Sequence, residues 1–210
     1  MKAKKNKRGS NNIIITIIFI VVGVALFGYL GYRVYNDFFK DNAVRKPVDS
    51  IELYEYTLSS NDTEIYKTYF KELTAILNEK PINYSEYAKC ISKLFIIDVY
   101  TLDNKLGSTD IGGVEFLHKD LRNNFKENMG SSLYKFIEIN LNGDRQQELP
   151  IVEDVEIEDI TETKWTYNDK EYPGYTINAK WTYVKDLGYQ NTIKLTIIND
   201  NDILYIVKGE

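Results

Sequence analysis

Residues 13–32, IIITIIFIVVGVALFGYLGY, form a run of twenty positions without a charged side chain. A helix of twenty residues covers about 30 Å, which is the thickness of the hydrocarbon core of a bilayer. The preceding residues 1–12 carry five basic side chains and no acid. Because basic flanks stay in the cytoplasm, the sequence predicts a basic cytoplasmic tail over 1–12, a transmembrane helix over 13–32 and a domain outside the cell membrane, in a single-pass arrangement.

The same segment admits a second interpretation, a cleaved signal peptide. Gly23, Val24 and Ala25 resemble the small-residue site at which such peptides are cut. The apolar run continues for seven residues beyond Ala25, which is longer than a usual signal core and favours a retained anchor.

The remainder of the chain is acidic. Residues 41–210 hold 19 basic and 30 acidic side chains, a net charge of −11. Such a domain has no non-specific attraction to phosphates, so we expect no nucleic-acid binding. A basic protein partner is favoured by the same charge.

Cys90 is the only cysteine, so no internal disulfide can form and zinc spacing is absent. Its helical spacing with Tyr87, Ile91 and Leu94 predicts a buried structural thiol. We predict no metal and no cofactor, and a domain outside the cell would then depend on its hydrophobic core.

The segment that follows the predicted span is divided at a proline. We assign residues 33–49 to a stem, which Pro47 ends, and residues 50–210 to one extracytoplasmic domain. Within that domain, the alternating residues 51–58 predict a short strand.

Hydrophobic periodicity near 3.6 then predicts three helices. The first covers residues 62–79, and the second begins at Asn83, which forms a capping-box-like pair with Glu86. Residues 106–120 read as a loop, and the third helix is predicted over 120–140.

After Pro150 the apolar period changes from 3.6 to 2. Four strands follow at close spacing, joined by short polar turns, which predicts an antiparallel meander. One strand places Tyr175, Ile177, Ala179, Trp181 and Tyr183 on a single face. The predicted fold class is therefore α+β, with about three helices packed on a curved antiparallel sheet of about four strands.

The basic MKAKKNKR with residues 13–32, the helices through YFKELTAIL and CISKLFIIDVYTL, and the strands from VEIEDITETKWTY onward carry a resemblance. This order resembles the nuclear transport factor 2-like (cystatin-like) superfamily, and within it the VirB-type assembly proteins of type IV secretion and their Gram-positive conjugation relatives. The resemblance implies an extracytoplasmic domain that self-associates and contacts other channel subunits. It does not imply catalysis, since the superfamily contains both enzymes and binding domains.

Two residues are candidates for chemistry. Asp98 lies among apolar residues of the second helix, where burial in a pocket would raise its pKa and suit it to act as a general base. The alternative, which the helix position favours, is an acid that trims the helix or binds a tyrosine hydroxyl. His118 is the only histidine and is ordinarily a loop or capping residue, with a catalytic role only beside Asp98. No nucleotide-binding, zinc-protease or serine-hydrolase motif is present, so we predict no enzyme.

Aromatic residues of the predicted sheet offer a binding surface. Trp165, Tyr167, Trp181 and Tyr183 gather on two neighbouring strands, where core packing explains most of them and a peptide or ligand groove is the alternative. The acidic run over 153–162 alternates like a strand, which favours a solvated face over a calcium loop.

These observations predict a membrane-anchored extracytoplasmic protein-binding domain. We expect it to be a scaffold subunit of a cell-envelope assembly such as a conjugative transfer channel, with other envelope proteins as partners and a homo-oligomer as a further expectation. The alternative is a small-molecule binding domain, or an isomerase- or dehydratase-like enzyme that uses Asp98 in a pocket between sheet and helices.

Overall fold

The computed structural model describes residues 22–32, 45–167 and 169–210. The chain divides into two units, Met1–Asn42 and Ala43–Glu210, and in the first of these residues 22–32 are helical. Within the described residues, no helix is both long enough and apolar enough to cross a membrane. Residues 13–21 of the predicted span and residues 33–44 of the predicted stem lie outside the described residues.

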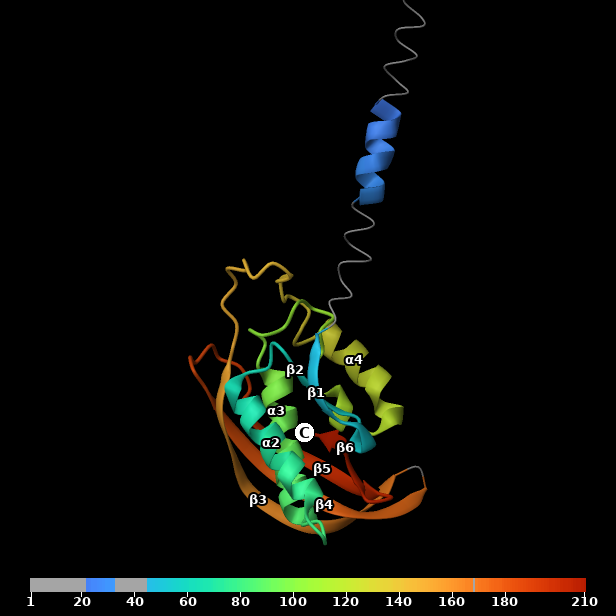
Figure 1. Ribbon diagram of the computed structural model, residues 1–210, viewed down its shortest axis with the longest axis vertical. Helices are drawn as coiled ribbons and strands as arrows, with labels where there is room; N and C mark the ends of the chain where they lie inside the picture. Colours follow the sequence, from blue (N-terminus) through green and yellow to red (C-terminus); the bar gives the residue numbers. More distant parts are fainter. Residues whose placement is uncertain (1–21, 33–44, 168) are drawn as a thin grey trace, which may run out of the picture. The chain divides into compact units, whose positions relative to one another are not determined.

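The second unit has an α+β architecture with two antiparallel sheets, as Figure 1 shows. The larger sheet has the order β3-β4-β5-β6, which confirms the predicted four-stranded meander, and the smaller one pairs β1 with β2. In chain order the elements are β1 (Pro47–Ile51), η1 (Glu52–Tyr54), β2 (Tyr56–Ser59), α2 (Glu64–Asn78), α3 (Tyr84–Tyr100), η2 (Val114–Phe116), η3 (Lys119–Leu121), α4 (Arg122–Ser131), β3 (Val152–Tyr167), β4 (Lys170–Tyr183), β5 (Thr192–Asp200) and β6 (Ile203–Gly209), where η marks a 3₁₀ turn.

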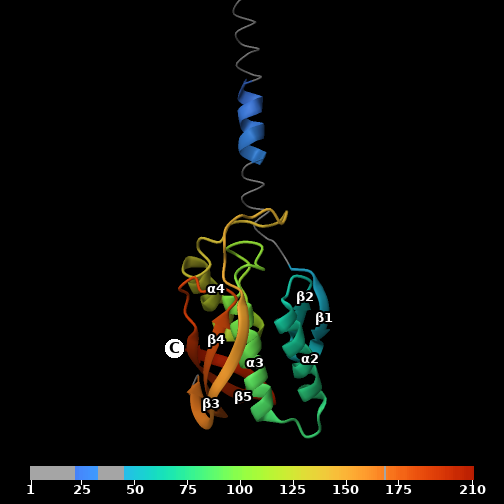
Figure 2. The same ribbon diagram turned by 90° about the vertical axis from the view of Figure 1, so that its left-hand side faces the viewer.

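The helices α2 and α3 begin where the sequence predicts. The Thr63 hydroxyl accepts a hydrogen bond from the backbone N–H of Tyr66, and the Asn83 side chain accepts one from the backbone N–H of Glu86, at 3.4 and 3.3 Å. Twelve of the 17 residues of α3 are buried, so this helix has no broad solvent face. It lies between α2 and the curved sheet, which wraps around it (Figures 1 and 2).

The concave face of the sheet completes the core. Ile177, Ala179 and Trp181 of β4 are buried at alternating positions, as the period of 2 predicts. The Trp181 ring lies 4.4 Å from the Tyr100 ring, measured between centroids. The predicted thiol Cys90 is also in this core, with 2% exposure, and its Sγ–H donates to the Tyr69 carbonyl.

The predicted third helix over 120–140 is wrong in its second half, because α4 ends at Ser131. Gly130 is a poor helix former, and the Ser132 hydroxyl bonds back to the carbonyl of Asn128 at 2.6 Å. Beyond this point Tyr134 turns inward and is fully buried, with its hydroxyl 2.7 Å from the Val99 carbonyl. A tertiary contact thus overrides the helical periodicity.

The predicted single strand over 51–58 is also wrong. Glu55 has a φ of 59° and reverses the chain, so β1 and β2 form an antiparallel pair around the turn η1. Tyr56 then enters the core, where its hydroxyl lies 2.6 Å from that of Tyr87. Part of β1 lies in the range 33–49 assigned to the stem, and Arg45 of that range packs into the domain.

Tyr134→Phe should destabilise the domain by about 1–3 kcal/mol. The Tyr134 hydroxyl donates to the Val99 carbonyl and accepts from the Gly112 N–H at 3.2 Å, so its removal leaves two buried backbone groups without this partner. Urea denaturation of the full chain measures the change. Tyr205→Phe, at a half-buried ring, is the control and should stay within about 0.5 kcal/mol of wild type; equal effects of the two variants would contradict the prediction.

Candidate functional site

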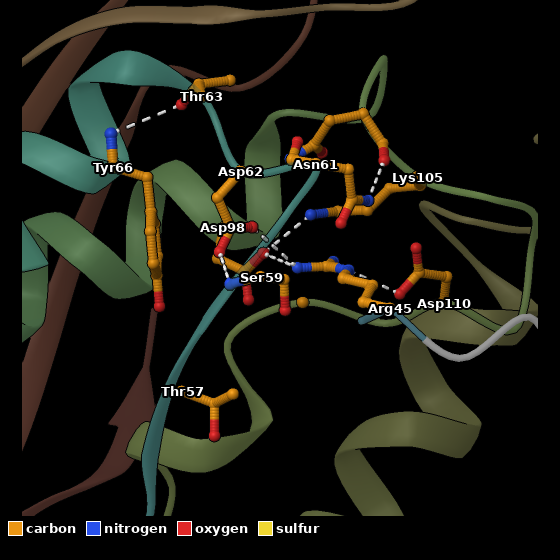
Figure 3. A network of polar contacts seen from close by, with 12 residues as sticks. Arg45, Thr57, Ser59, Asn61, Asp62, Thr63, Tyr66, Asp98, Lys105 and Asp110 are labelled. Carbon is orange, nitrogen blue, oxygen red and sulfur yellow. Dashed lines mark hydrogen bonds and ion pairs between the residues drawn. The ribbon is translucent and has the colours of Figure 1, made fainter. Parts of the chain in front are cut away.

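Five charged side chains meet inside the domain, at the end where its described chain begins (Figure 3). The Arg45 guanidinium contacts three carboxylates, those of Asp98 and Asp110 at 2.8 Å and that of Asp62 at 3.3 Å. The Lys105 ammonium lies 2.7 Å from the same Asp98 carboxylate. We call Arg45, Asp62, Asp98, Lys105 and Asp110 the buried charge network.

Each acid of the buried charge network comes from a different segment. Asp98 lies in the last turn of α3. Asp62 precedes α2 and accepts a hydrogen bond from the Ser59 N–H at 2.7 Å, and Asp110 accepts one from the Leu106 N–H at 2.9 Å. The two flanking acids therefore stabilise their own loops while they bind Arg45.

The Asp98 carboxylate has little capacity for a further partner. Its Oδ1 accepts from both cations, and its Oδ2 accepts from the Gly113 N–H at 2.6 Å. This approach requires glycines, because a Cβ at Gly112 would overlap the Asp98 carbonyl and Gly113 has a φ of 75°. The segment 110–113, DIGG, thus closes over the end of α3.

Burial would by itself raise the pKa of Asp98, but the neighbouring charges of Lys105 and Arg45 outweigh it and lower that pKa well below its usual range. Asp98 is therefore ionised at neutral pH and is a weak base. The buried charge network contains two cations and three carboxylates, so negative charge exceeds positive charge within it. Burial raises the pKa of Asp62 in the same place.

The prediction that Asp98 trims a helix or binds a tyrosine hydroxyl is wrong, because its side chain lies at the centre of an ion network. The raised pKa that a general base would need is equally contradicted. In the described part of the chain, His118 is not among the side chains that contact the Asp98 carboxylate. The His118 ring instead packs edge-on against Tyr167 and Tyr205, with centroids 4.9 and 5.4 Å away.

A pocket of about 420 Å³ opens beside the network. Glu115 faces it, and the carboxyl oxygens of this residue accept hydrogen bonds from the Thr57 N–H at 3.1 Å and from the Tyr66 hydroxyl at 3.2 Å. Burial and the nearby Asp98 carboxylate raise the pKa of Glu115 to about 8. Lys126 lies at the pocket rim.

The predicted aromatic binding residues do not form one site. Trp181 is 1% exposed and belongs to the core, with Tyr183 half-buried beside it. Trp165 and Tyr167 lie at the other end of the β3–β4 hairpin, where Trp165 pairs with Tyr172. Trp181 follows Tyr172 by nine positions in β4, which corresponds to roughly 30 Å along the strand.

Asp98 could be singled out from the sequence, but the residues that define its chemistry could not. Arg45 was assigned to a stem, and Lys105 and Glu115 were not selected. The one available signal was the pair of adjacent glycines after Asp110, which is typical of a close backbone approach.

Comparisons of the chain with protein-family models, with curated proteins and with solved structures found no significant match.

Asp98→Asn should destabilise the domain by about 3–5 kcal/mol, because it leaves the Lys105 and Arg45 charges buried without their central counter-ion. The midpoint of urea denaturation measures the loss. Glu64→Gln is the matched control, since it breaks an exposed ion pair with Lys67 and should leave the urea midpoint almost unchanged. Similar small effects in both variants would show that the buried network contributes little.

Glu115→Gln should remove a pH dependence of stability between about pH 4.5 and pH 8. The folded pKa of Glu115 is about 8 against an ordinary value of 4.5, so the folded state binds the proton more tightly. Wild-type stability must then fall as pH rises through this window.

The variant should match wild type near pH 4 and exceed it by roughly 4 kcal/mol near pH 8.5. Urea denaturation at a series of pH values measures both curves. Parallel curves over the whole range would contradict a raised pKa at Glu115.

Proposed function

We propose that this chain is a membrane-anchored extracytoplasmic protein-binding domain that serves as a scaffold subunit of a cell-envelope assembly, such as a conjugative transfer channel. In this proposal residues 13–32 supply the anchor and the acidic domain faces the outside. The observation that supports protein binding is that the outer edge of β3 is free for pairing with another strand.

The strand β3 is 16 residues long and is the terminal strand of the larger sheet. Within the part of the chain that the structure describes, the outer edge of β3 from Glu153 to Thr166 has no backbone partner. Such an edge presents a row of N–H and C=O groups to an extended segment of another protein. This is the mode of binding that we infer.

Charge defines the kind of segment that fits. Lys164 is the only basic residue of β3, whereas Lys180 of the neighbouring strand neutralises part of the acidic set, with contacts to Glu156 and Glu158 at 3.2 and 3.5 Å. The acids of β3 are Glu153, Asp154, Glu156, Glu158, Asp159 and Glu162. A basic extended segment is therefore favoured.

The same charge disfavours pairing between two copies through this edge. If β3 of one copy lay beside β3 of another, acids would face acids across the pair, which is destabilising. A homo-oligomer of this domain would use a different surface.

The proposed anchor favours the interaction by keeping the domain close to its partners. Arg45 binds three carboxylates at the start of the domain, so the chain that arrives from the proposed membrane span is attached firmly to the core. Confinement to a layer at the membrane raises the effective concentration of the domain for partners held in the same layer.

The alternative function, a small-molecule enzyme, depended on Asp98 as a general base, and the state of this residue does not suit that role. Asp98 is ionised and bound to two cations, so it cannot supply a base with a pKa near neutral pH. Glu115 has such a pKa and faces a pocket, and a ligand role would therefore depend on Glu115 with Tyr66.

The test is crosslinking of the full chain in the membranes of its host. A photo-crosslinking amino acid at Asp159, an exposed position of β3, should capture an envelope protein at a basic, extended segment, identified by mass spectrometry. Replacement of Glu153 and Glu162 by lysine should lower the yield at least fivefold, because it reduces the net charge of β3 from −5 to −1.

The matched control carries the crosslinker at Glu72, an exposed position of α2. Equal capture of the same protein from Glu72, or a yield that the lysine variant leaves unchanged, would contradict binding at the β3 edge.

A further inference from the structure

The segment between α4 and β3 exposes apolar side chains that the core does not use. Phe136 is 75% exposed, Ile139 51% and Leu141 38%. Three such residues lie within six positions of one loop, which we call the 136–141 loop. Exposed apolar side chains that gather into a patch can mark a site of contact with another molecule or with a membrane.

The 136–141 loop is structured rather than loosely attached. The Arg145 side chain at its base is 2% exposed and donates to the carbonyls of Lys105 and Glu138, at 3.0 and 3.1 Å. Gln147 donates to the Phe136 carbonyl and accepts from the Glu138 N–H. The apolar side chains therefore project outward from a hydrogen-bonded loop.

This loop lies at the end of the domain where the described chain begins, which both views show (Figures 1 and 2). The Asn140 N–H donates to the Leu106 carbonyl at 2.9 Å, and the Leu106 N–H donates to the Asp110 carboxylate. Asp110 in turn binds Arg45 at 2.8 Å. A short series of contacts thus connects the loop with the entry point of the chain.

The length of chain before that entry point identifies the occupant. Residues 33–44 separate the end of the proposed anchor from Arg45, and twelve residues extend to at most about 45 Å. The end of the domain that carries Arg45 can therefore lie no further than about 45 Å from the end of the proposed anchor. The loop with the exposed apolar side chains lies at that same end of the domain.

We propose that Phe136, Ile139 and Leu141 insert into the headgroup region of the bilayer that holds the anchor. Lys135 and Arg145 offset Glu138 and Asp144 in this part of the chain, so the contact is apolar and suits zwitterionic lipid. The inference rests on the anchor proposed for residues 13–32. It adds a second, lateral contact that orients the domain on the membrane.

The test uses the full chain in phosphatidylcholine vesicles, with Cys90→Ser as background so that one introduced cysteine carries a fluorescent nitrobenzoxadiazole label. The label at Phe136→Cys should be quenched at least twofold by lipids that carry a nitroxide on the acyl chain. The label at Leu53→Cys should not respond, because Leu53 is equally exposed, at 77%, but lies in η1, beyond the five residues of β1 that lead away from the entry of the chain, roughly 17 Å of strand.

A third label, at Phe27→Cys in the helical residues 22–32, reports on the anchor itself. Quenching at positions 27 and 136 supports the inference. Quenching at 27 alone overturns the inference and leaves the proposed anchor intact, whereas no quenching at 27 overturns the anchor and the inference with it. A label at 136 that neither lipid nor an aqueous quencher reaches would show that protein covers the loop, which also overturns lipid insertion.

Discussion

The buried charge network around Asp98 is the interaction on which the rest of the domain depends. A carboxylate in the last turn of α3 is surrounded by the core, where an unpaired charge would be very costly. Lys105 and Arg45 offset that cost, and the adjacent glycines 112 and 113 let the backbone approach close enough to donate a further hydrogen bond. The central helix can therefore be buried along almost its whole length although it contains an acid.

The buried charge network also joins segments that are far apart in the sequence. Arg45 precedes the first strand, Asp62 the first long helix, and Asp110 belongs to the loop after α3. Because Arg45 binds all three acids, the chain that leads to the proposed anchor is connected to the core at its most buried helix. A pull on the anchor would act on α3 and its neighbours rather than on a single edge strand.

Periodicity predicted the parts of this fold whose burial is regular. The helix α2 buries residues at steps of three and four, and β4 alternates from Ile177 to Trp181, so local pattern and tertiary structure agree there. The predictions failed where a distant contact decides the conformation, as for Tyr134 beyond α4, and where a turn forms without glycine, as at Glu55 with its positive φ. The prediction of the site was incomplete because it also depends on distant contacts. The partners of Asp98 lie 53 and 7 residues away in the sequence. No spacing rule connects an acid in an apolar helix with an arginine in a segment that reads as a linker.

The proposed lipid contact and the proposed protein contact are consistent with one orientation of the domain. The strand β3 is the next element after the loop that carries Phe136, and in Figure 1 it begins toward the entry end of the domain and runs away from it for 16 residues, roughly 50 Å of strand. In an orientation with the loop in the headgroup layer, most of the acidic edge would lie beyond the lipid, where its charges stay hydrated and its backbone groups stay accessible. Apolar side chains at the entry end and acids along the departing strand therefore allow both contacts at once, and exchanging the two features would place carboxylates in lipid and apolar side chains in water.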